Sequence, residues 1–360
     1  DHGGAILVRD SSGVSIEDCV FLSNQATNGH GGALAVVGEC RVLVTDCVFS
    51  HNQSSGLGGA VYSDYRASFA VDSCAITFNT ANAGGGIYAG GPLSTVTTCD
   101  ITDNTGSNGG GIFIQNGMTV RDCLIARNSA GGVSAGSGQW SAFGGTLIDC
   151  RIRDNDGFGV WGRHEITDCI LEGNTGRGLE LRGGNVIGSV IRDNSGGGLL
   201  LAAGTASGCS ITGNSAPWGA GVKVSPDTWA SSACVDSCLI SGNHAEEGGG
   251  GLYCSEATSI YGLDLAVTRS TIAGNSSSSG GGVYATRYYH GLQVALDRCV
   301  IWGNHADSLA NEIFVVDTAT VVTMTCSAVD TNGIAGDAPV QFIGPQVHDY
   351  PLFCAPEPWY

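Results

Sequence analysis

The middle of the chain gathers side chain types that bind and cleave sugars. Four of the six tryptophans lie between residues 140 and 229, and Glu180, Arg163, Arg182 and the chain's single lysine, Lys223, lie in the same stretch. Aromatic rings offer flat apolar platforms, and a few charged groups fix the orientation of a ligand. The candidate ligand-binding residues are Trp140, Trp161, Arg163, Arg182, Trp218, Lys223 and Trp229, and Glu180 is the candidate catalytic residue.

Catalysis sets further conditions on these residues. An inverting glycoside hydrolase needs two carboxyl groups about 6.5–9.5 Å apart. A calcium-dependent lyase needs clustered acids for the ion and a separate base. Glu180 is the one convincing outward carboxylate, whereas Asp154, Asp156 and Asp193 alternate with arginines, as on a solvated charged face. We therefore predict no metal site and no cofactor, with Ca²⁺ relevant only if the protein is a lyase. The enzyme question stays open, leaning towards no enzyme.

Composition excludes several classes of partner. The 360 residues include 58 glycines, and 33 acidic residues against 15 basic ones give a formal net charge of −18. Nucleic acids and anionic membranes are bound through basic surfaces, so neither is an expected partner. No apolar run approaches the roughly 18–20 residues of a membrane helix. The chain begins inside a repeat without a signal peptide, so we interpret it as the mature part of a longer, secreted precursor.

A repeat runs through most of the chain. Five residues before each repeated asparagine lies Cys, or Ser at 189 and 270, and three residues before it lies a large apolar residue. A polar turn, a glycine-led strand such as GGAVY (58–62) and a second apolar strand such as RVLVTD (41–46) complete each unit. The repeated asparagines are Asn24, Asn52, Asn79, Asn104, Asn128, Asn155, Asn174, Asn194, Asn214, Asn243, Asn275 and Asn304.

These units predict a solenoid. Each holds three short alternating strands, and alternation places one face of a strand in the core. No single unit can bury that face, but stacked units can, with equivalent residues about 4.8 Å apart. We therefore predict an all-β, right-handed parallel β-helix of about twelve coils over residues 1–330. Five prolines after residue 338 predict an irregular C-terminal cap or tail over 331–360.

The repeated polar residues have structural explanations. We expect each asparagine to take a left-handed bend and to hydrogen-bond to the asparagines above and below it. We expect the ten repeated cysteines to be buried thiols, because stacked side chains do not converge as a disulfide requires. We do not expect zinc, because a flat ladder cannot surround a metal ion tetrahedrally and no Cys-x-x-Cys occurs. Cys326 with Cys354 is the candidate disulfide, tying the C-terminal tail to the last coil.

The outward residue of each glycine-led strand forms a column along the solenoid. Stacked aromatic rings in that column could simply stabilise the sheet, or they could form a platform for sugars or a partner protein. Both interpretations stay open. The candidate aromatic surface comprises Tyr62, Tyr88, Phe113, Tyr253, Tyr284 and Phe314.

Coil lengths predict a notch in the outer face. The coils that end at Asn174, Asn194 and Asn214 have 19–20 residues, whereas the flanking coils have 27–32. Long insertions on either side of short coils would leave a hollow over coils 155–225. Its predicted floor holds Trp161, Glu180 and Lys223, with Arg163 and Arg182 nearby. Trp140 and Trp229 would stand on its walls.

Two motifs carry a family resemblance. GGAI (3–6), GGAL (31–34) and GGAV (58–61), with FLSN (21–24) and FSHN (49–52), resemble the GGA[ILV] and FxxN repeats of chlamydial polymorphic outer-membrane proteins. The chain to about residue 330 also resembles right-handed β-helix proteins of the pectate-lyase-like superfamily. This resemblance implies a secreted or surface-displayed solenoid.

The two branches of the resemblance imply different functions. One branch implies a structural or adhesive role in an extracellular assembly, which we favour. The other implies a polysaccharide lyase, a glycoside hydrolase or a glycan-binding module. The expected partners are a second copy of the chain docked end to end, an upstream segment of the precursor, or a polysaccharide.

Overall fold

The chain folds into two compact units, Asp1–Leu179 and Glu180–Tyr360. The structure is a computed structural model that describes residues 2–136, 144–226, 232–255, 262–287 and 291–344. Almost all regular structure in these residues is β, and the one short helix is the 3₁₀ turn η1, Thr331–Gly333.

The first unit repeats three strands. The glycine-led strands are β1 (Ile6–Val8), β5 (Leu34–Val36), β9 (Val61–Ser63), β12 (Ile87–Ala89), β15 (Ile112–Ile114) and β18 (Val133–Ala135). The strands that precede the cysteine are β2 (Gly13–Glu17), β6 (Arg41–Thr45), β10 (Ser68–Asp72), β13 (Thr95–Thr97), β16 (Met118–Arg121) and β19 (Gly145–Ile148). The strands that follow it are β3 (Val20–Leu22), β7 (Val48–Ser50), β11 (Ala75–Thr77), β14 (Asp100–Thr102), β17 (Leu124–Ala126), β20 (Arg151–Arg153) and β22 (Ile170–Glu172). The short strands β4 (Gln25–Ala26) and β8 (Gln53–Ser54) follow the first two asparagines.

The second unit repeats the same three classes. Its glycine-led strands are β25 (Leu199–Leu201), β29 (Val222–Val224), β33 (Leu252–Ser255), β37 (Val283–Thr286), β41 (Ile313–Val315) and β44 (Ile334–Gly336). Before the cysteine position lie β26 (Gly204–Ser207), β30 (Ser232–Asp236), β34 (Leu263–Thr268), β38 (Leu292–Asp297), β42 (Thr320–Thr325) and β45 (Gln341–Ile343). After it lie β24 (Val190–Arg192), β27 (Ser210–Thr212), β31 (Leu239–Ser241), β35 (Thr271–Ala273), β39 (Val300–Trp302) and β43 (Ala328–Val329).

Short coils join two strands into one. β21 (Val160–Thr167) and β23 (Leu179–Ile187) each run from the glycine-led position to the position before the cysteine. The expected shortness of these coils therefore comes from the missing connection between the first two strands.

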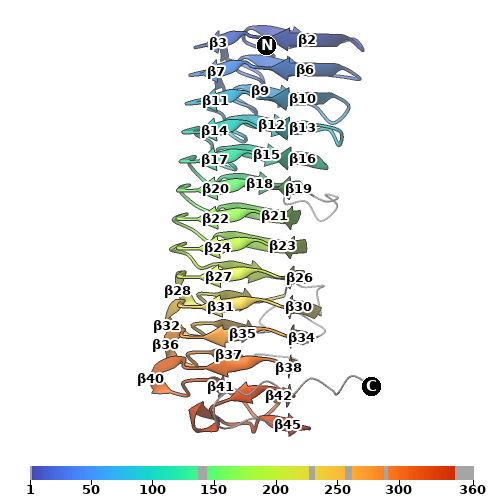
Figure 1. The fold of residues 1–360 in the computed structure, drawn as a ribbon. Coiled ribbons are helices and arrows are strands. Elements are labelled where there is room, and N and C mark those ends of the chain that lie inside the picture. Colours follow the sequence, from blue (N-terminus) through green and yellow to red (C-terminus); the bar gives the residue numbers. More distant parts are fainter. Residues whose placement is uncertain (1, 137–143, 227–231, 256–261, 288–290, 345–360) are drawn as a thin grey trace, which may run out of the picture. The chain divides into compact units, whose positions relative to one another are not determined.

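Equivalent strands of successive coils pair in parallel and in register. The core is therefore built from columns of equivalent residues. Phe49, Ile76 and Ile101 occupy one column of the first unit, and Ile211, Ile240 and Ile272 occupy the same column of the second. All six are fully buried. Figure 1 shows successive rungs of each strand class within each unit. The predicted parallel β-helix is confirmed, because equivalent residues of successive units cover each other's apolar faces.

The asparagines form a buried hydrogen-bond ladder. The side chain Oδ1 of Asn79 accepts hydrogen bonds from the backbone N–H of Asn52 (2.9 Å) and from its amide group (2.9 Å). The amide of Asn79 in turn donates to the carbonyl of Phe49 (3.0 Å) and to the next asparagine, Asn104 (3.0 Å). The pattern repeats along both units, so each side chain satisfies a backbone group of its neighbour in an otherwise apolar core.

A glutamate takes the place of the next asparagine after Asn304. The carboxylate of Glu312 accepts the backbone N–H of Asn304 (3.3 Å) and its side chain amide (2.6 Å). Glu312 is buried, and burial raises the pKa of its carboxyl group. The ladder therefore ends on a side chain with the same two acceptor contacts.

The left-handed bend lies one residue earlier than we predicted. Ser23, His51, Phe78 and Asp103 each lie directly before a ladder asparagine and have positive φ angles between 56° and 60°. The asparagines themselves are absent from the positive-φ positions. The expectation was wrong because the asparagine must keep its side chain turned into the core, which the preceding bend makes room for.

Glycine is required where successive coils touch. A Cβ built on Gly32 or Gly59 would lie about 2.1 and 2.0 Å from the carbonyl oxygen of the glycine in the next coil, respectively. The obstacle is backbone and cannot move aside. These glycines therefore permit the close coil-to-coil approach that the ladder imposes.

The cysteines form a second ladder. The sulfur of Cys74 accepts the backbone N–H of Cys47 (3.4 Å), and its thiol donates to the carbonyl of Asp72 (3.1 Å). Ser270 fills the same position and accepts the backbone N–H of Cys238 (3.1 Å), which confirms that the position needs a small inward group. Cys47, Cys74, Cys99, Cys123 and Cys150 are buried, free cysteines, as predicted.

Two features differ from the expected three-strand coil and its boundary. The second unit adds β28 (Ser215–Trp218), β32 (His244–Gly248), β36 (Ser276–Ser279) and β40 (His305–Leu309), which pair in parallel after the asparagine. The stretch between the asparagine and the glycines is extended there. Pairing also passes residue 330, because β44 pairs with β41 and β45 with β42. The coil therefore reaches residue 343, later than the boundary we expected.

One buried histidine lies inside the first unit. His164 on β21 is fully buried, and its Nε2 lies 3.2 Å from the carbonyl oxygen of Trp161. Its Nδ1 has no hydrogen-bond partner in the described residues. Burial lowers the pKa of His164 to about 4, so the ring is neutral at physiological pH.

Removing a ladder asparagine should destabilise the second unit. In Asn214→Ala, the backbone N–H of Asn194 loses its acceptor (3.1 Å) and the carbonyl of Ile191 loses its donor (3.0 Å). We expect a loss of about 2–5 kcal/mol in the free energy of unfolding, measured by urea denaturation. Thr212→Ala, on the half-buried face of β27, is the control and should change that free energy by less than about 0.5 kcal/mol. Equal effects of the two variants would contradict the ladder.

Acid should destabilise the first unit through His164. The unfolded side chain titrates near pH 6.5, whereas the folded one has a pKa of about 4. The unfolded state therefore binds the proton first, and about 3 kcal/mol of stability present above pH 6.5 is lost as the pH falls to 4. The free energy of unfolding of His164→Leu should fall less steeply with pH over this range. A slope in His164→Leu parallel to that of the wild-type protein would refute the assignment.

The buried thiols should resist alkylation. Burial raises the pKa of Cys299 to about 11, so little thiolate is present at pH 8. We expect Cys47, Cys74 and Cys299 to react with iodoacetamide only after denaturation, and the half-buried Cys19 to react in the native protein. Peptide mass spectrometry reads out each site. Rapid native labelling of Cys74, or a disulfide between Cys19 and Cys47, would show that the ladder is not a set of packed thiols.

Candidate functional site

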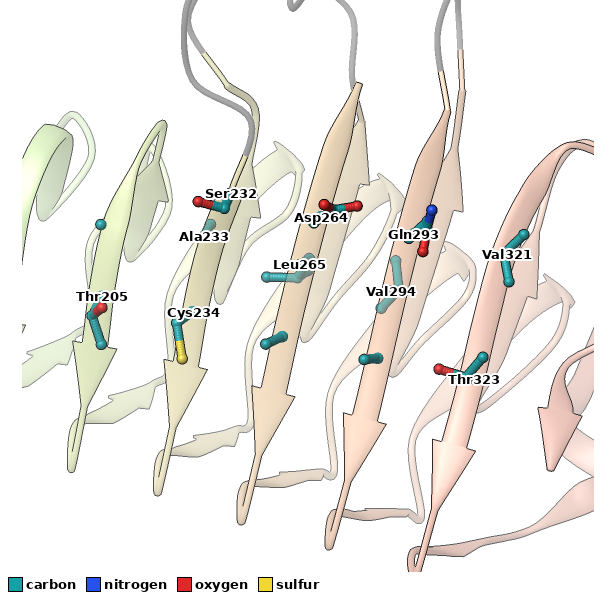
Figure 2. A pocket seen from close by; sticks show the side chains of 13 residues that line it. Thr205, Ser232, Ala233, Cys234, Asp264, Leu265, Gln293, Val294, Val321 and Thr323 are labelled. Atoms are coloured by element: carbon teal, nitrogen blue, oxygen red, sulfur yellow. The ribbon is translucent and has the colours of Figure 1, made fainter. Parts of the chain in front are cut away.

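A trough crosses the outer face of the second unit. It has a cavity volume of about 460 Å³ and lies over β26, β30, β34, β38 and β42. Figure 2 shows its side chains in rows that cross these five strands. Because the strands are parallel and in register, each row holds the same repeat position in successive coils.

Small side chains make the trough hollow. The floor row lies four residues before the cysteine position and consists of Thr205, Cys234, Ala266, Ala295 and Thr323. These residues pair directly across the strands. None of these side chains extends further from the sheet than that of threonine. The protein surface is therefore lower along the whole row. Five strands at about 4.8 Å spacing make this row about 19 Å long.

The rim row carries the hydrogen-bonding groups. It lies six residues before the cysteine position and consists of Ser232, Asp264, Gln293 and Val321. Asp264 and Gln293 are exposed and point out of neighbouring strands (Figure 2). Asp264 is the one charged side chain among the described residues that line the trough. A small apolar floor beside a few polar groups is the usual composition of a ligand site.

The other border of the trough holds paired charges. Asp236 accepts hydrogen bonds from Arg269 (3.0 and 2.6 Å), and these bonds lower the pKa of its carboxyl group. Arg298 pairs with Asp297 at 2.8 Å. Both aspartates lie two residues before the cysteine position. Their charges are therefore balanced locally.

The first unit has a shallower counterpart. A hollow of about 290 Å³ lies over β2, β6 and β10, with Leu43 at the floor position and Arg41 at the rim position. The side chain of Leu43 is 43% exposed and stands above the sheet. The same repeat position thus closes one hollow with a large side chain and opens the other with small ones.

The predicted notch residues fall in both units. Trp161 is half-buried and Arg163 exposed on β21 of the first unit. In the second unit, Glu180 is buried and accepts hydrogen bonds from Arg182 at 3.0 and 2.7 Å. Because side chains alternate along a strand, these two residues share one face of β23 and form an ion pair. Glu180 is thus a paired, buried carboxylate and not the open acid that we expected.

The remaining candidates belong to aromatic packing or lie outside the description. Trp218 packs against Tyr253 and Tyr284, with ring centroids 5.2 and 5.5 Å apart. The ammonium group of Lys223 lies 5.5 Å from the centre of the Tyr253 ring, within the range of a cation–π contact. Trp140 and Trp229 lie outside the described residues.

The aromatic column is stacked in both units. Tyr62, Tyr88 and Phe113 have centroid separations of 5.5 and 5.2 Å, and His30 continues the row 4.6 Å from Tyr62. Tyr253 and Tyr284 stack at 5.4 Å, and the ring of Phe314 lies 5.4 Å from Tyr284 at a tilt of 59°. Tyr88 and Tyr253 are buried, so the column is not an open platform along its length. Stacking that stabilises the sheet explains these rings.

Two further predictions concern a metal site and a disulfide. Among the described residues, no group of three His, Cys, Asp or Glu side chains is placed to hold a metal ion. Cys326 is half-buried with a φ of 45° at the bend before Ser327, which occupies the cysteine position. Its predicted partner, Cys354, lies outside the described residues, so the disulfide stays a prediction.

The sequence analysis missed the trough because it considered the outward residues of a different strand class. The outward column that we considered belongs to the glycine-led strands, whereas the trough lies on the strands before the cysteine. A signal was present in the sequence. Thr205, Cys234, Ala266, Ala295 and Thr323 are all small four residues before the cysteine position, where the first unit has the large Leu43 as well as small residues such as Ala70.

Comparison with known families agrees with this architecture. The model of the right-handed β-helix region matches residues 4–165 and 107–216, which together span more than half of the chain. The chain belongs to the right-handed β-helix family. The Chlamydia polymorphic membrane protein repeat also matches this β-helix, over residues 237–255. Among curated proteins there is no match.

Two solved structures resemble the β-helix at low sequence identity. One is a mannuronic acid specific polysaccharide family 6 lyase from human gut microbiota, with 9% identity, a TM-score of 0.39 and coverage of 93% of this chain and 87% of that one. The other is the PL6 family alginate lyase AlyGC, with 9% identity, a TM-score of 0.26 and coverage of 95% and 68%. At these values neither likeness bears on activity. No helix formed by the described residues has the length and apolar character of a membrane span.

Proposed function

We propose that this β-helix is a secreted or cell-surface protein with a structural or adhesive role, and that it contacts extended glycans through the trough of its second unit. The observation that carries the proposal is the in-register row of small side chains from Thr205 to Thr323. A long hollow with a regular floor accommodates an extended polymer better than a compact ligand. The Chlamydia polymorphic membrane protein repeat matches residues 237–255, and this match supports surface display. The matched residues include β31 and β32, which adjoin the trough strands in the sequence.

Such contact needs only that the floor and rim side chains are held in fixed positions. The asparagine and cysteine ladders fix the strand spacing, so the floor and rim groups are held before a ligand arrives. Ser232, Asp264 and Gln293 offer donors and acceptors to hydroxyl groups, and Ala266 and Ala295 offer an apolar surface to ring faces. Little side chain freedom is lost on binding to such a surface, which favours affinity.

A polysaccharide-active enzyme is the second candidate function. Asp264 favours it, because an exposed carboxylate at the edge of a groove is placed to act as a general base. A Ca²⁺-dependent lyase would also need clustered acidic ligands, and the described residues supply no such cluster. We therefore derive no step through Ca²⁺.

One incubation separates the two candidates. The full chain is mixed with a panel of polysaccharides, including alginate, pectate, mannan and chitosan, and both retention and new chain ends are measured. Adhesion predicts saturable retention on at least one polymer without unsaturated products or new reducing ends. Products that accumulate well beyond one per protein molecule, and vanish in Asp264→Asn, would instead establish the enzyme. No retention on any polymer or on cells would contradict glycan adhesion.

A further inference from the structure

The rim position of the repeat carries opposite charges in the two units. Six residues before the cysteine position lie Arg41 and Arg163 in the first unit, and Asp264 in the second. All three are exposed on the strand before the cysteine. The repeat itself therefore does not dictate an acid at this position, since the same backbone place accepts a guanidinium group. Asp264 is a feature of the trough.

The charge of the trough is negative over the described residues. Asp264 contributes the charge, and no Lys or Arg is among the described lining residues. Arg269 and Arg298 hydrogen-bond to Asp236 and Asp297 on the far border, and Arg287, shortly before β38, pairs with Asp317 at 3.5 Å. Among the described lining residues, a ligand carboxylate laid along the floor would thus face Asp264 with no Lys or Arg beside it. Like charges at such a distance repel, and repulsion of this kind is a source of selectivity.

The floor also limits the shape of the ligand. Its five small residues form a straight row of about 19 Å, long enough for several linked sugar units in extended form. The row is apolar at Ala266 and Ala295, while Ser232 and Gln293 stand beside Asp264 at the rim. Ring faces would lie on the floor while hydroxyl and amine groups turn towards the rim.

We propose that the trough of the second unit binds linear glycans that carry amines and not carboxylates, that is, hexosamine polymers, with Asp264 pairing with an ammonium group. This inference rests on the proposed glycan contact and adds the chemical class of the ligand. An ammonium group paired with a carboxylate gives a charge-assisted hydrogen bond, whereas a uronate at the same place meets repulsion.

Binding of matched oligosaccharides to the full chain tests the class. Isothermal titration uses a glucosamine oligomer, its N-acetylated form and a mannuronate oligomer of equal length. The glucosamine oligomer should bind about tenfold more tightly than the acetylated form, and the mannuronate oligomer most weakly. Asp264→Asn should remove the tenfold preference, and so should high salt, which screens the pair. Protection of Cys234 from alkylation by the bound oligomer locates the ligand on the floor, because Cys234 is half-buried there.

Two variants at the floor position test the hexosamine ligand class and the glycan site separately. Ala295→Leu fills the trough and should abolish binding of all oligomers, whereas Thr119→Leu, at the same repeat position in the first unit, should leave it intact. If Ala295→Leu abolishes binding but mannuronate is preferred, or Asp264→Asn keeps the amine preference, the hexosamine class is refuted and the glycan site survives. If no oligomer binds, or both leucine variants bind normally, the site itself is refuted.

Discussion

The asparagine ladder is the constraint on which the rest of the structure depends. Each side chain amide donates twice and accepts twice, and its partners are the backbone and side chain of neighbouring coils. This arrangement fixes the distance between coils at one point of every turn. The cysteine five residues earlier and the apolar residue three residues earlier then stack without any further requirement on the sequence. Glycine beside the ladder follows from the same spacing, since a Cβ on Gly32 or Gly59 would meet backbone there.

The ladder also decides where the chain can vary. Inserted residues are accommodated between the glycine-led strand and the strand before the cysteine, and their removal leaves a single long strand, as in β21. Outward positions of the strands carry no ladder contact. Leu43, Thr119 and Ala295 therefore occupy one position of the repeat with little consequence for the core. Function on such a scaffold depends on which outward row is lowered and what borders it.

The coil was predictable from the sequence because its determinants are short-range and repeated twelve times. Asparagine, cysteine and the apolar residue each recur at a fixed offset, and stacking is the one way in which all units bury their apolar faces. Finer geometry was not predictable in the same way. The left-handed bend could belong to Asn79 or to Phe78 by residue type alone, and phenylalanine is the less expected choice.

The candidate site was harder to predict because it depends on contacts between outward side chains. Alternation placed Glu180 outward, but it also placed Arg182 on the same face, and their pairing buries the carboxylate. The trough arises from five small residues in different coils, and small residues rarely attract attention as binding residues. They form a hollow only because they are aligned across β26, β30, β34, β38 and β42.

Native-state hydrogen exchange at the ladder amides tests the central claim most directly. The backbone N–H groups of Asn79, Asn104 and Asn243 lie in bends but donate to the side chains of the next asparagines at 2.9–3.0 Å. The ladder predicts that these amides exchange as slowly as those of the adjoining core strands. Exchange at the rate of exposed turn amides, while the strands stay protected, would show that the asparagines do not hold the coils together.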